Sequence, residues 1–289
     1  MRSARYIGYL FILPYLTFLG LFLAFPLGFA VWMSFFDYFF AAPGAQVERP
    51  FVGLGNYHDL LLNDETFRTT LGNIFVFIAV NVPLTVVLAL ILAAALNAKL
   101  PGQTFFRTSY YLPYVTASVA VVAVWGYLFF SEGLVNHILG NLAPHPSWLV
   151  NEFWAMIVIS LLVTWKQLGY YVLLYLAALQ NVPRDLYDAA DVDGAGAMGK
   201  FWNVTVPGLR PVTMLVVILS TIIGANLFTE PYLLTNGGGP LNQTLSPILY
   251  MYQVGIEQAD AGYAAAIGVT MALVVLAIAA AQRFVLERE

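Results

Sequence analysis

The chain has 289 residues, of which 60% are hydrophobic and 10% are charged. Soluble domains carry about 25% charged residues, so this composition excludes an ordinary soluble protein and indicates an integral membrane protein. The formal net charge of −4 comes from few charged side chains, which argues against nucleic acid as a partner, and the lack of cysteine excludes disulfides and thiolate chemistry.

Six stretches are apolar enough to cross a bilayer, which takes about 20 residues in a helix. They are residues 6–36, 68–96, 110–130, 153–179, 212–234 and 263–285. The first stretch is too long for a signal peptide and has no small-x-small cleavage site, so we expect a retained anchor. The sequence therefore predicts an all-α, polytopic membrane protein with six transmembrane helices, in which residues 1–289 form a single transmembrane domain.

Lysine and arginine lie mostly on one side of these six spans. That side carries Arg2, Arg5, Lys99, Arg107, Arg184, Lys200, Arg210, Arg283 and Arg288. The loops 131–152 and 235–260 on the other side have neither residue type. Because positive residues collect on the cytoplasmic side, we expect both termini and the loop 181–211 to be cytoplasmic.

The loop 181–211 is polar and acidic in an otherwise apolar chain. Its residues predict a short helix ending at Gly194, a second short helix, and a stop at Pro207. Such a loop between two spans is a surface suited to contact a protein outside the membrane.

Two nucleotide-binding patterns in this loop are coincidental. Gly194, Gly196 and Gly199 match GxGxxG, but a dinucleotide fingerprint must follow a strand, and here the glycines follow a helix. A P-loop needs Ser or Thr after its lysine to hold Mg²⁺, and Phe201 stands there. We expect no nucleotide site in this chain.

A metal or catalytic site is not expected either. Asp185, Asp188 and Asp191 share one face of a short helix, and Asp193 follows, but the face is solvated and without histidine. The sequence has no HExxH or GxSxG motif and no histidine within a span. The chain is therefore predicted not to be an enzyme.

Five polar residues interrupt the predicted spans, and a charged group there is costly unless it faces a cavity or a partner. They are Asn81, Lys166, Gln167, Asn226 and Glu230. One interpretation is a polar translocation path formed by Lys166, Gln167, Tyr170, Asn226 and Glu230. The other is that Lys166 and Glu230 lie near span ends and snorkel, or form a structural pair.

The loop resembles the EAA loop of ABC importer permeases. That loop reads Glu-Ala-Ala, a spacer, Asp-Gly-Ala, an aromatic position and a proline. The matching residues are Leu186, Tyr187, Asp188, Ala189, Ala190, Asp193, Gly194, Ala195, Phe201 and Pro207. Asp188 stands where the family usually has Glu, which keeps the charge on a shorter side chain.

Further stretches resemble the carbohydrate permeases of the maltose-importer type, a binding-protein-dependent family. They are residues 51–57 (Phe-Val-Gly-Leu-Gly-Asn-Tyr), 105–108, 234–240 and 262–268. The resemblance extends over nearly the whole chain, and it implies the fold of an ABC importer permease in a bacterial inner membrane.

The resemblance also implies partners and a mechanism. The partners are a second, homologous permease, two ATPase subunits that bind ATP and Mg²⁺ in place of this chain, and an extracytoplasmic substrate-binding protein. The loop would couple ATP hydrolysis to alternating access of a sugar or oligosaccharide. Glycerophosphodiesters, amino sugars or polyols are alternative substrates, and an ion-coupled secondary carrier is the alternative of another class.

Overall fold

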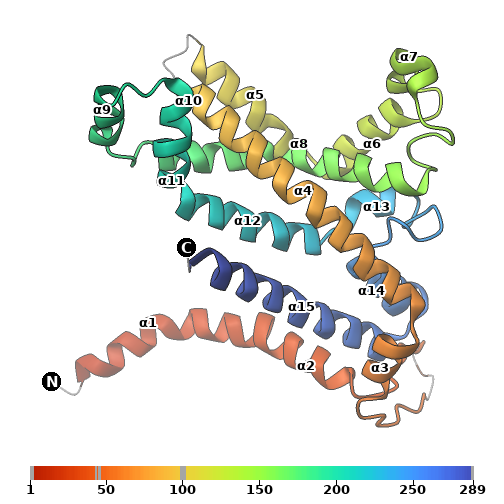
Figure 1. The fold of residues 1–289 in the computed structure, drawn as a ribbon. Helices are drawn as coiled ribbons and strands as arrows, with labels where there is room; N and C mark the ends of the chain where they lie inside the picture. Colours follow the sequence, from red (N-terminus) through yellow and green to blue (C-terminus); the bar gives the residue numbers. More distant parts are fainter. Residues whose placement is uncertain (1–2, 43, 45–46, 98–101, 288–289) are drawn as a thin grey trace. The chain divides into compact units, whose positions relative to one another are not determined.

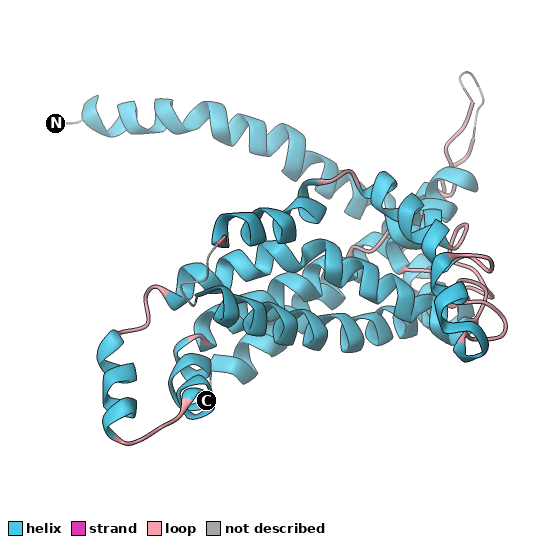
Figure 2. Ribbon diagram, turned by 90° about the horizontal axis from the view of Figure 1, so that it is seen from above, coloured by secondary structure: helices cyan, strands magenta, loops and turns pink. Residues whose placement is uncertain are grey.

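The computed structural model describes residues 3–42, 44, 47–97 and 102–287, with the side chains of residues 11–284. The described residues are helical or irregular, with two isolated β-bridges and no strand (Figure 2). The chain divides into two compact units, residues 1–67 with 250–274 and residues 68–249 with 275–289. Arg2, Lys99 and Arg288, which support the predicted orientation, lie outside the described residues.

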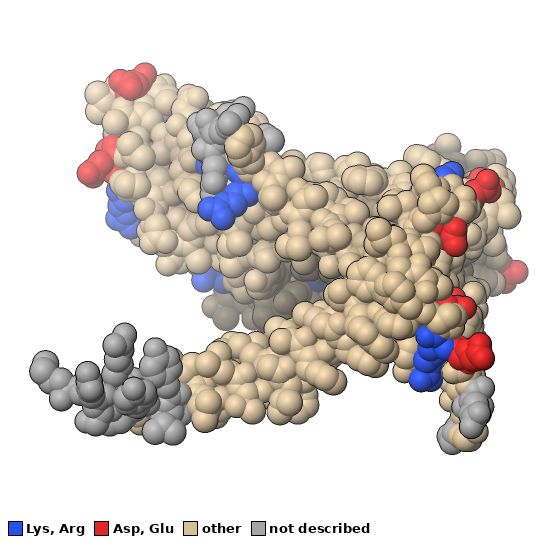
Figure 3. Space-filling model, turned by 90° about the horizontal axis from the view of Figure 1, so that it is seen from below, with Lys and Arg blue, Asp and Glu red and all other residues tan. Residues whose placement is uncertain are grey.

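Five described helices are long and apolar enough to cross a membrane, or six if one bent pair is a single span. The candidates are Phe11–Met33, Glu65–Asn97, Ser118–Leu142, Glu152–Leu179, Ala261–Phe284 and the bent pair Ala197–Gly208 with Arg210–Ala225. In Figure 3 the charged side chains on the visible face lie in groups, and broad stretches of surface between these groups carry none. The prediction of an all-helical protein with several membrane spans is confirmed.

The first unit contains α1 (Ser3–Leu19) and α2 (Phe25–Met33), joined by a π-helical turn at Gly20–Ala24. It also holds the short helix α3 (Gly55–His58), followed by a π-helical turn at Asp59–Asn63, and the second half of α14 (Pro247–Tyr252). A π-helical turn at Gln253–Glu257 leads to α15 (Ala261–Glu287), of which the first part belongs here (Figure 1).

Two of the motif stretches meet in this unit. Asn56 donates from Nδ2 to the carbonyls of Ser34, at 2.9 Å, and Phe36, at 3.1 Å. A Cβ on Gly262 would lie 2.2 Å from that same Phe36 carbonyl oxygen, so this position requires glycine. The motifs 51–57 and 262–268 therefore build one packed junction.

Asp64 ties together three segments of the first unit. Its Oδ2 accepts hydrogen bonds from the hydroxyls of Tyr250, at 2.7 Å, and Tyr263, at 2.8 Å. Its Oδ1 accepts from the backbone N–H of Phe67, which caps α4. Burial, together with the bond to Asp64, raises the pKa of Tyr250, so this hydroxyl stays protonated and keeps donating.

The second unit holds the longer helices and the loop. It contains most of α4 (Glu65–Asn97), α5 (Gln103–Val115), α6 (Ser118–Phe129), α7 (Leu134–Leu139), α8 (Glu152–Leu179), α9 (Arg184–Val192), α10 (Ala197–Lys200), α11 (Val206–Gly208), α12 (Arg210–Ala225) and α13 (Thr229–Leu234). A 3₁₀ turn at Gly140–Leu142 follows α7, and a π-helical turn at Phe201–Thr205 joins α10 to α11.

Helix α8 is the centre of the second unit. Asn151 caps its N-terminus by accepting from the N–H groups of Phe153 and Trp154, both at 3.1 Å. One core cluster surrounds Tyr171 and Tyr175 of α8, and a second surrounds its N-terminal half. More of α8 is buried than of any other candidate span among the described residues, so this helix positions the candidate site.

Two predicted spans are interrupted in the structure. Residues 110–130 are divided by extended backbone at Thr116, three residues after Pro113, into α5 and α6. Residues 212–234 are divided between Asn226 and Phe228 into α12 and α13. Predicting single helices there was wrong. Pro113 lies inside α5, which continues to Val115, so only the second break is attributed to a proline, Pro231.

The second break follows directly from Pro231. In a continuous helix, residue 231 would donate its N–H to the carbonyl of Leu227, and proline has no N–H to donate. That carbonyl instead accepts a hydrogen bond from the hydroxyl of Ser246. The freed backbone group is thereby satisfied inside the protein, as membrane depth requires.

Candidate functional site

The loop 181–211 folds as the sequence predicts as far as Gly194. The N–H of Ala195 bonds the carbonyl of Ala190 at 2.9 Å, and the N–H of Gly194 bonds Asp191 at 3.1 Å. These are the two bonds of a Schellman motif, and Gly194 has the left-handed φ of +75° that the motif requires. The predicted end of the first helix is confirmed.

The second helix runs one residue past the predicted stop at Pro207. Residues 197–208 continue through a π-helical turn, and the chain then bends by 67° at Leu209 into α12. Pro211 explains the bend, because it has no N–H to donate to the carbonyl of Pro207. The bend marks the end of the loop and the start of the following membrane helix.

The inner face of α9 is anchored to the body of the second unit. The hydroxyls of Tyr187 and Thr205 are 3.0 Å apart, which joins α9 to the second helix of the loop. Tyr187 and Ala190, three residues apart on one face, pack against a core cluster that includes Val204. Two side chains of the predicted set therefore hold the loop in place.

The outer face of α9 and α10 combines carboxylates with exposed apolar side chains. Leu186 is 49% exposed, and Asp188 and Ala189 are also exposed. Lys200 Nζ lies 2.7 Å from Asp191 Oδ1, while Asp185, Asp188 and Asp193 form no ion pair with another described residue. No cluster of metal ligands is present among the described residues. The carboxylates of Asp185, Asp188 and Asp193 are exposed at the surface of this unit.

Sequence reasoning missed three apolar contributors to this surface. Val192 is 89% exposed, Met198 69% and Trp202 60%. Large apolar side chains exposed in a polar loop are suited to contact another protein. The signal in the sequence was the presence of these side chains in a loop that is otherwise polar. In Figure 1, α9 lies beyond the C-terminal end of α8.

A substitution at Gly194 tests the geometry of the loop. Gly194→Ala is expected to destabilise the end of α9 by about 1–2 kcal/mol, because a Cβ disfavours left-handed backbone. The measurement is amide hydrogen exchange of residues 190–195 in lipid nanodiscs, which should become faster. Gly196→Ala is the matched control, since Gly196 has φ −67° and open space around its Cβ position. Equal exchange in both variants would contradict the Schellman geometry.

The structure brings together Lys166 and Glu230 of the predicted translocation path. Lys166 Nζ on α8 lies 3.6 Å from Glu230 Oε1 on α13, and the two side chains are 15% and 11% exposed. Lys166 also donates to the hydroxyl of Ser118 at the start of α6. The two charges neutralise each other at the point where three helices meet, which agrees with the structural-pair interpretation.

Gln167 and Tyr170 lie beside this pair on α8. The ring of Tyr170 stacks on Tyr114 of α5, with centroids 5.1 Å apart and planes 12° apart. Gln167 accepts a hydrogen bond from Tyr171 at 3.3 Å. The contact of Tyr114 with Tyr170 was not predicted, because the sequence does not show which helices pack together. Both Gln167 and Tyr170 remain partly exposed, so they can contact a solute.

Asn226 lies at the break between α12 and α13. Its side chain is exposed, and its Nδ2 donates to the carbonyl of Ile222 on its own helix at 2.8 Å. Broken helices expose backbone groups that suit polar solutes. The structure thus places Asn226 at an irregular point of the span, four residues before Glu230.

Asn81 has a structural role. Its Nδ2 donates to Thr164 Oγ1 at 2.8 Å, and both residues are buried between α4 and α8. Such interhelical hydrogen bonds stabilise helix pairs in membranes. Asn81 therefore joins two helices and does not line a path.

The fold and the loop together define a polytopic helical membrane protein with a polar loop between two of its spans. A profile of the family described as "binding-protein-dependent transport system inner membrane component" matches residues 73–288. The chain belongs to this family, and it is therefore a multi-pass membrane protein.

Curated relatives and a solved structure agree with this assignment. The chain is 36% identical over 274 residues to the lactose transport system permease protein LacF of Rhizobium radiobacter, covering 93% of this chain and 90% of LacF. It is 32% identical to the sn-glycerol-3-phosphate transport system permease protein UgpA of Yersinia enterocolitica, covering 99% and 96%. A crystal structure of a bacterial alginate ABC transporter in complex with a pentasaccharide-bound periplasmic protein has a chain of the same fold, with a TM-score of 0.82 at 21% identity and coverage of 99% and 96%.

Proposed function

We propose that this chain is the permease subunit of an ATP-driven, binding-protein-dependent importer for a sugar or short oligosaccharide in a bacterial inner membrane. The loop 181–211 and both termini face the cytoplasm. The complex contains a second permease, two ATPase subunits that bind ATP and Mg²⁺, and an extracytoplasmic binding protein. The observation that carries this proposal is the anchored loop with its exposed apolar and acidic outer face, in a chain that belongs to this family.

The loop transmits movement because its two faces have different contacts. The outer face, with Leu186 and Asp188, binds the ATPase subunit. The inner face, with Tyr187 and Ala190, is packed against the helical core. When the ATPase subunit moves, the loop therefore moves with it as a rigid body and displaces α8 and α12, because packed side chains resist compression.

The substrate path runs beside Gln167, Tyr170 and Asn226. These groups offer amides and an aromatic face, which suit the hydroxyls and the apolar ring faces of a sugar. The cation of Lys166 is already paired with Glu230 at 3.6 Å. A neutral sugar is therefore favoured over a glycerophosphodiester, although the similarity to UgpA supports the phosphate ester as the second candidate.

Co-purification tests the docking loop. The double variant Leu186→Asp, Met198→Asp is expected to lose the ATPase subunit, because two exposed apolar contacts become charged without any change inside the fold. The measurement is the ATPase recovered with tagged chain in mild detergent, identified by mass spectrometry. Leu142→Asp is the matched control, since Leu142 is 84% exposed in the 3₁₀ turn that follows α7.

The outcomes separate three conclusions. Loss of the ATPase from the double variant alone supports the proposal. Equal recovery from wild type and double variant would mean that the ATPase binds elsewhere on the chain. If wild type never recovers an ATPase, the importer assignment fails, and transport by the isolated chain must be measured to test an ion-coupled carrier.

A further inference from the structure

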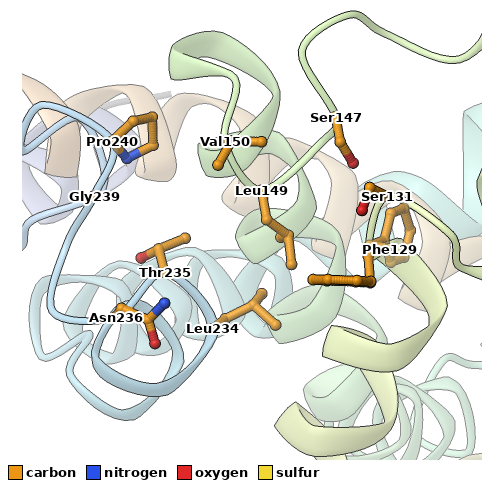
Figure 4. A pocket seen from close by; sticks show the side chains of 11 residues that line it. Phe129, Ser131, Ser147, Leu149, Val150, Leu234, Thr235, Asn236, Gly239 and Pro240 are labelled. Atoms are coloured by element: carbon orange, nitrogen blue, oxygen red, sulfur yellow. The ribbon is translucent and has the colours of Figure 1, made fainter.

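A pocket of about 350 Å³ lies in the second unit, between the segment after α6 and the segment after α13 (Figure 4). It is lined by Phe129, Phe130, Ser131, Ser147, Leu149, Val150, Leu234, Thr235, Asn236, Gly239 and Pro240. Its volume is at the lower end of the roughly 300–1,000 Å³ of small-molecule sites. The pocket thus has room for a small solute and is separate from the path residues on α8.

The pocket lies at the end of α8 that is remote from the coupling loop. Ser147 and Val150 precede the start of α8 at Glu152, whereas the loop follows its end at Leu179. A helix of 28 residues is about 42 Å long, which is the thickness of a bilayer with its headgroups. If the coupling loop is cytoplasmic, as the proposed function requires, the pocket opens on the outer side, where substrate arrives.

The lining combines an apolar floor with polar groups at the rim. In Figure 4, Leu149, Leu234 and Phe129 lie between two polar edges. One edge carries Ser131 and Ser147, and the opposite edge carries Asn236. The side chains of Ser131 and Asn236 form no hydrogen bond with another described residue, so they are available to a ligand.

The edge with the two serines is fixed before any ligand arrives. Asn136 donates to the carbonyls of Phe130, at 3.0 Å, and Ser131, at 2.9 Å. Trp148 donates from Nε1 to Asn136 Oδ1 at 2.7 Å. This network holds the segment before α8 against the end of α6, and Asn136 also donates to the hydroxyl of Ser147 at 3.3 Å.

The edge with Asn236 is equally rigid. The hydroxyls of Thr235 and Thr244 are 2.7 Å apart, and Thr244 also donates to the carbonyl of Gly239 at 2.7 Å. Gly238 has a φ of +103°, and a Cβ there would lie 2.8 Å from Leu245. Asn73 on α4 pins the same segment by donating to the carbonyls of Asn242 and Leu245. A preformed pocket costs little ordering on binding.

From this geometry we propose that the pocket between residues 129–131, 147–150 and 234–240 is an outer subsite for one or two rings of the transported sugar. A sugar ring presents an apolar face, which suits the floor of Phe129, Phe130, Leu149 and Leu234. Its hydroxyls, at the ring edge, suit the free amide of Asn236 and the hydroxyls of Ser131 and Ser147. The pocket holds the sugar between its release by the binding protein and its entry into the path on α8. This inference rests on the proposed function for the orientation of the chain.

The absence of cysteine from the chain permits a direct test. Ser131→Cys places a single thiol in the pocket, and Asn141→Cys places one at an exposed position of the same segment outside the lining. The assembled transporter is labelled in spheroplasts with a membrane-impermeant maleimide, with and without lactose, maltose or glycerol 3-phosphate. Lactose or maltose is expected to slow labelling of Ser131→Cys by about threefold at twice the dissociation constant, because two thirds of the pockets are then filled. Labelling of Asn141→Cys should not change.

A second variant tests recognition by the rim. Asn236→Gly removes the amide and keeps the positive φ of 50° at this position. In the Ser131→Cys background it is expected to raise the sugar concentration needed for half protection by about tenfold, as expected for the loss of a hydrogen bond worth about 1.4 kcal/mol. Unchanged half protection would overturn the role of the rim.

Uptake of the same solutes by the same cells separates this inference from the proposed function. If sugar is taken up and never protects Ser131→Cys, the outer subsite is wrong and the importer function stands. If sugar protects without uptake, the subsite stands and the importer function fails. Protection by sugar-free binding protein alone would make the pocket a protein-docking site, and protection by glycerol 3-phosphate alone would make it a site for phosphate esters; either result overturns the proposal.

Discussion

Replacing Gly169 by alanine is expected to remove most of the folded protein from the membrane. A Cβ at this position would lie 2.1 Å from the carbonyl oxygen of Tyr110 and 2.7 Å from the Cα of Tyr111. The obstructing atoms are backbone, so no side chain can move aside, and α5 and α8 would have to separate. The loss of folding stability is expected to exceed the roughly 1–3 kcal/mol that overpacking of a core usually causes.

The measurement is the yield and thermal midpoint of the monodisperse chain in mild detergent. Gly169→Val should be worse than Gly169→Ala, because its branched side chain is larger. Gly72→Ala on α4 is the matched control, since nothing lies within 4 Å of its Cβ position and alanine favours helix. If Gly169→Ala behaves like Gly72→Ala, the close approach of α5 and α8 does not exist in the membrane.

Gly169 also shows which part of the fold the sequence could predict. Apolar runs identify spans because the bilayer demands about 20 apolar residues in a helix. They do not say which helices touch, because lipid is as apolar as the partner helix, so pairing depends on small residues and polar contacts. A glycine between Leu168 and Tyr170 gave no indication that Tyr110 would lie against it.

The break between α12 and α13 was predictable in principle. Pro231 stands four residues after Leu227, at that break, and it is visible in the sequence. Membrane helices tolerate many prolines, as Pro83 inside α4 demonstrates. Whether a proline interrupts a membrane helix depends on whether another group satisfies the freed carbonyl. For Leu227 that group is the hydroxyl of Ser246, which lies 19 residues further along the chain.

The end of α9 in the loop 181–211 was predicted because its signal is local. Gly194 ends α9 through backbone conformation alone, which requires knowledge of neighbouring residues only. Which side of α9 faces outward depends on the contact between Tyr187 and Thr205, 18 residues apart. The exposure of Val192, Met198 and Trp202 likewise depends on the tertiary structure, and for this reason it was missed.

The pair of Lys166 and Glu230 is the strongest test of how the path is built. Each single variant, Lys166→Met or Glu230→Gln, is expected to lower stability by about 3–5 kcal/mol, because it leaves one buried charge without its partner. The double variant Lys166→Met, Glu230→Gln should regain most of this loss, since no unpaired charge remains. The measurement is the free energy of unfolding in detergent, arranged as a double-mutant cycle.

The exposed pair of Lys200 and Asp191 is the matched control for this cycle, with N–O distance 2.7 Å and side chains 29% and 57% exposed. Lys200→Met should cost no more than about 1 kcal/mol, because solvent screens the lost attraction. Recovery in the double variant with intact sugar uptake would mean that the pair positions α13 against α8 and touches no substrate. If stability recovers but uptake does not, the charges themselves take part in moving the solute. A Glu230→Gln variant that gains uptake of glycerol 3-phosphate would show that Glu230 normally withholds Lys166 from anionic substrates, and it would extend the substrate class of the path.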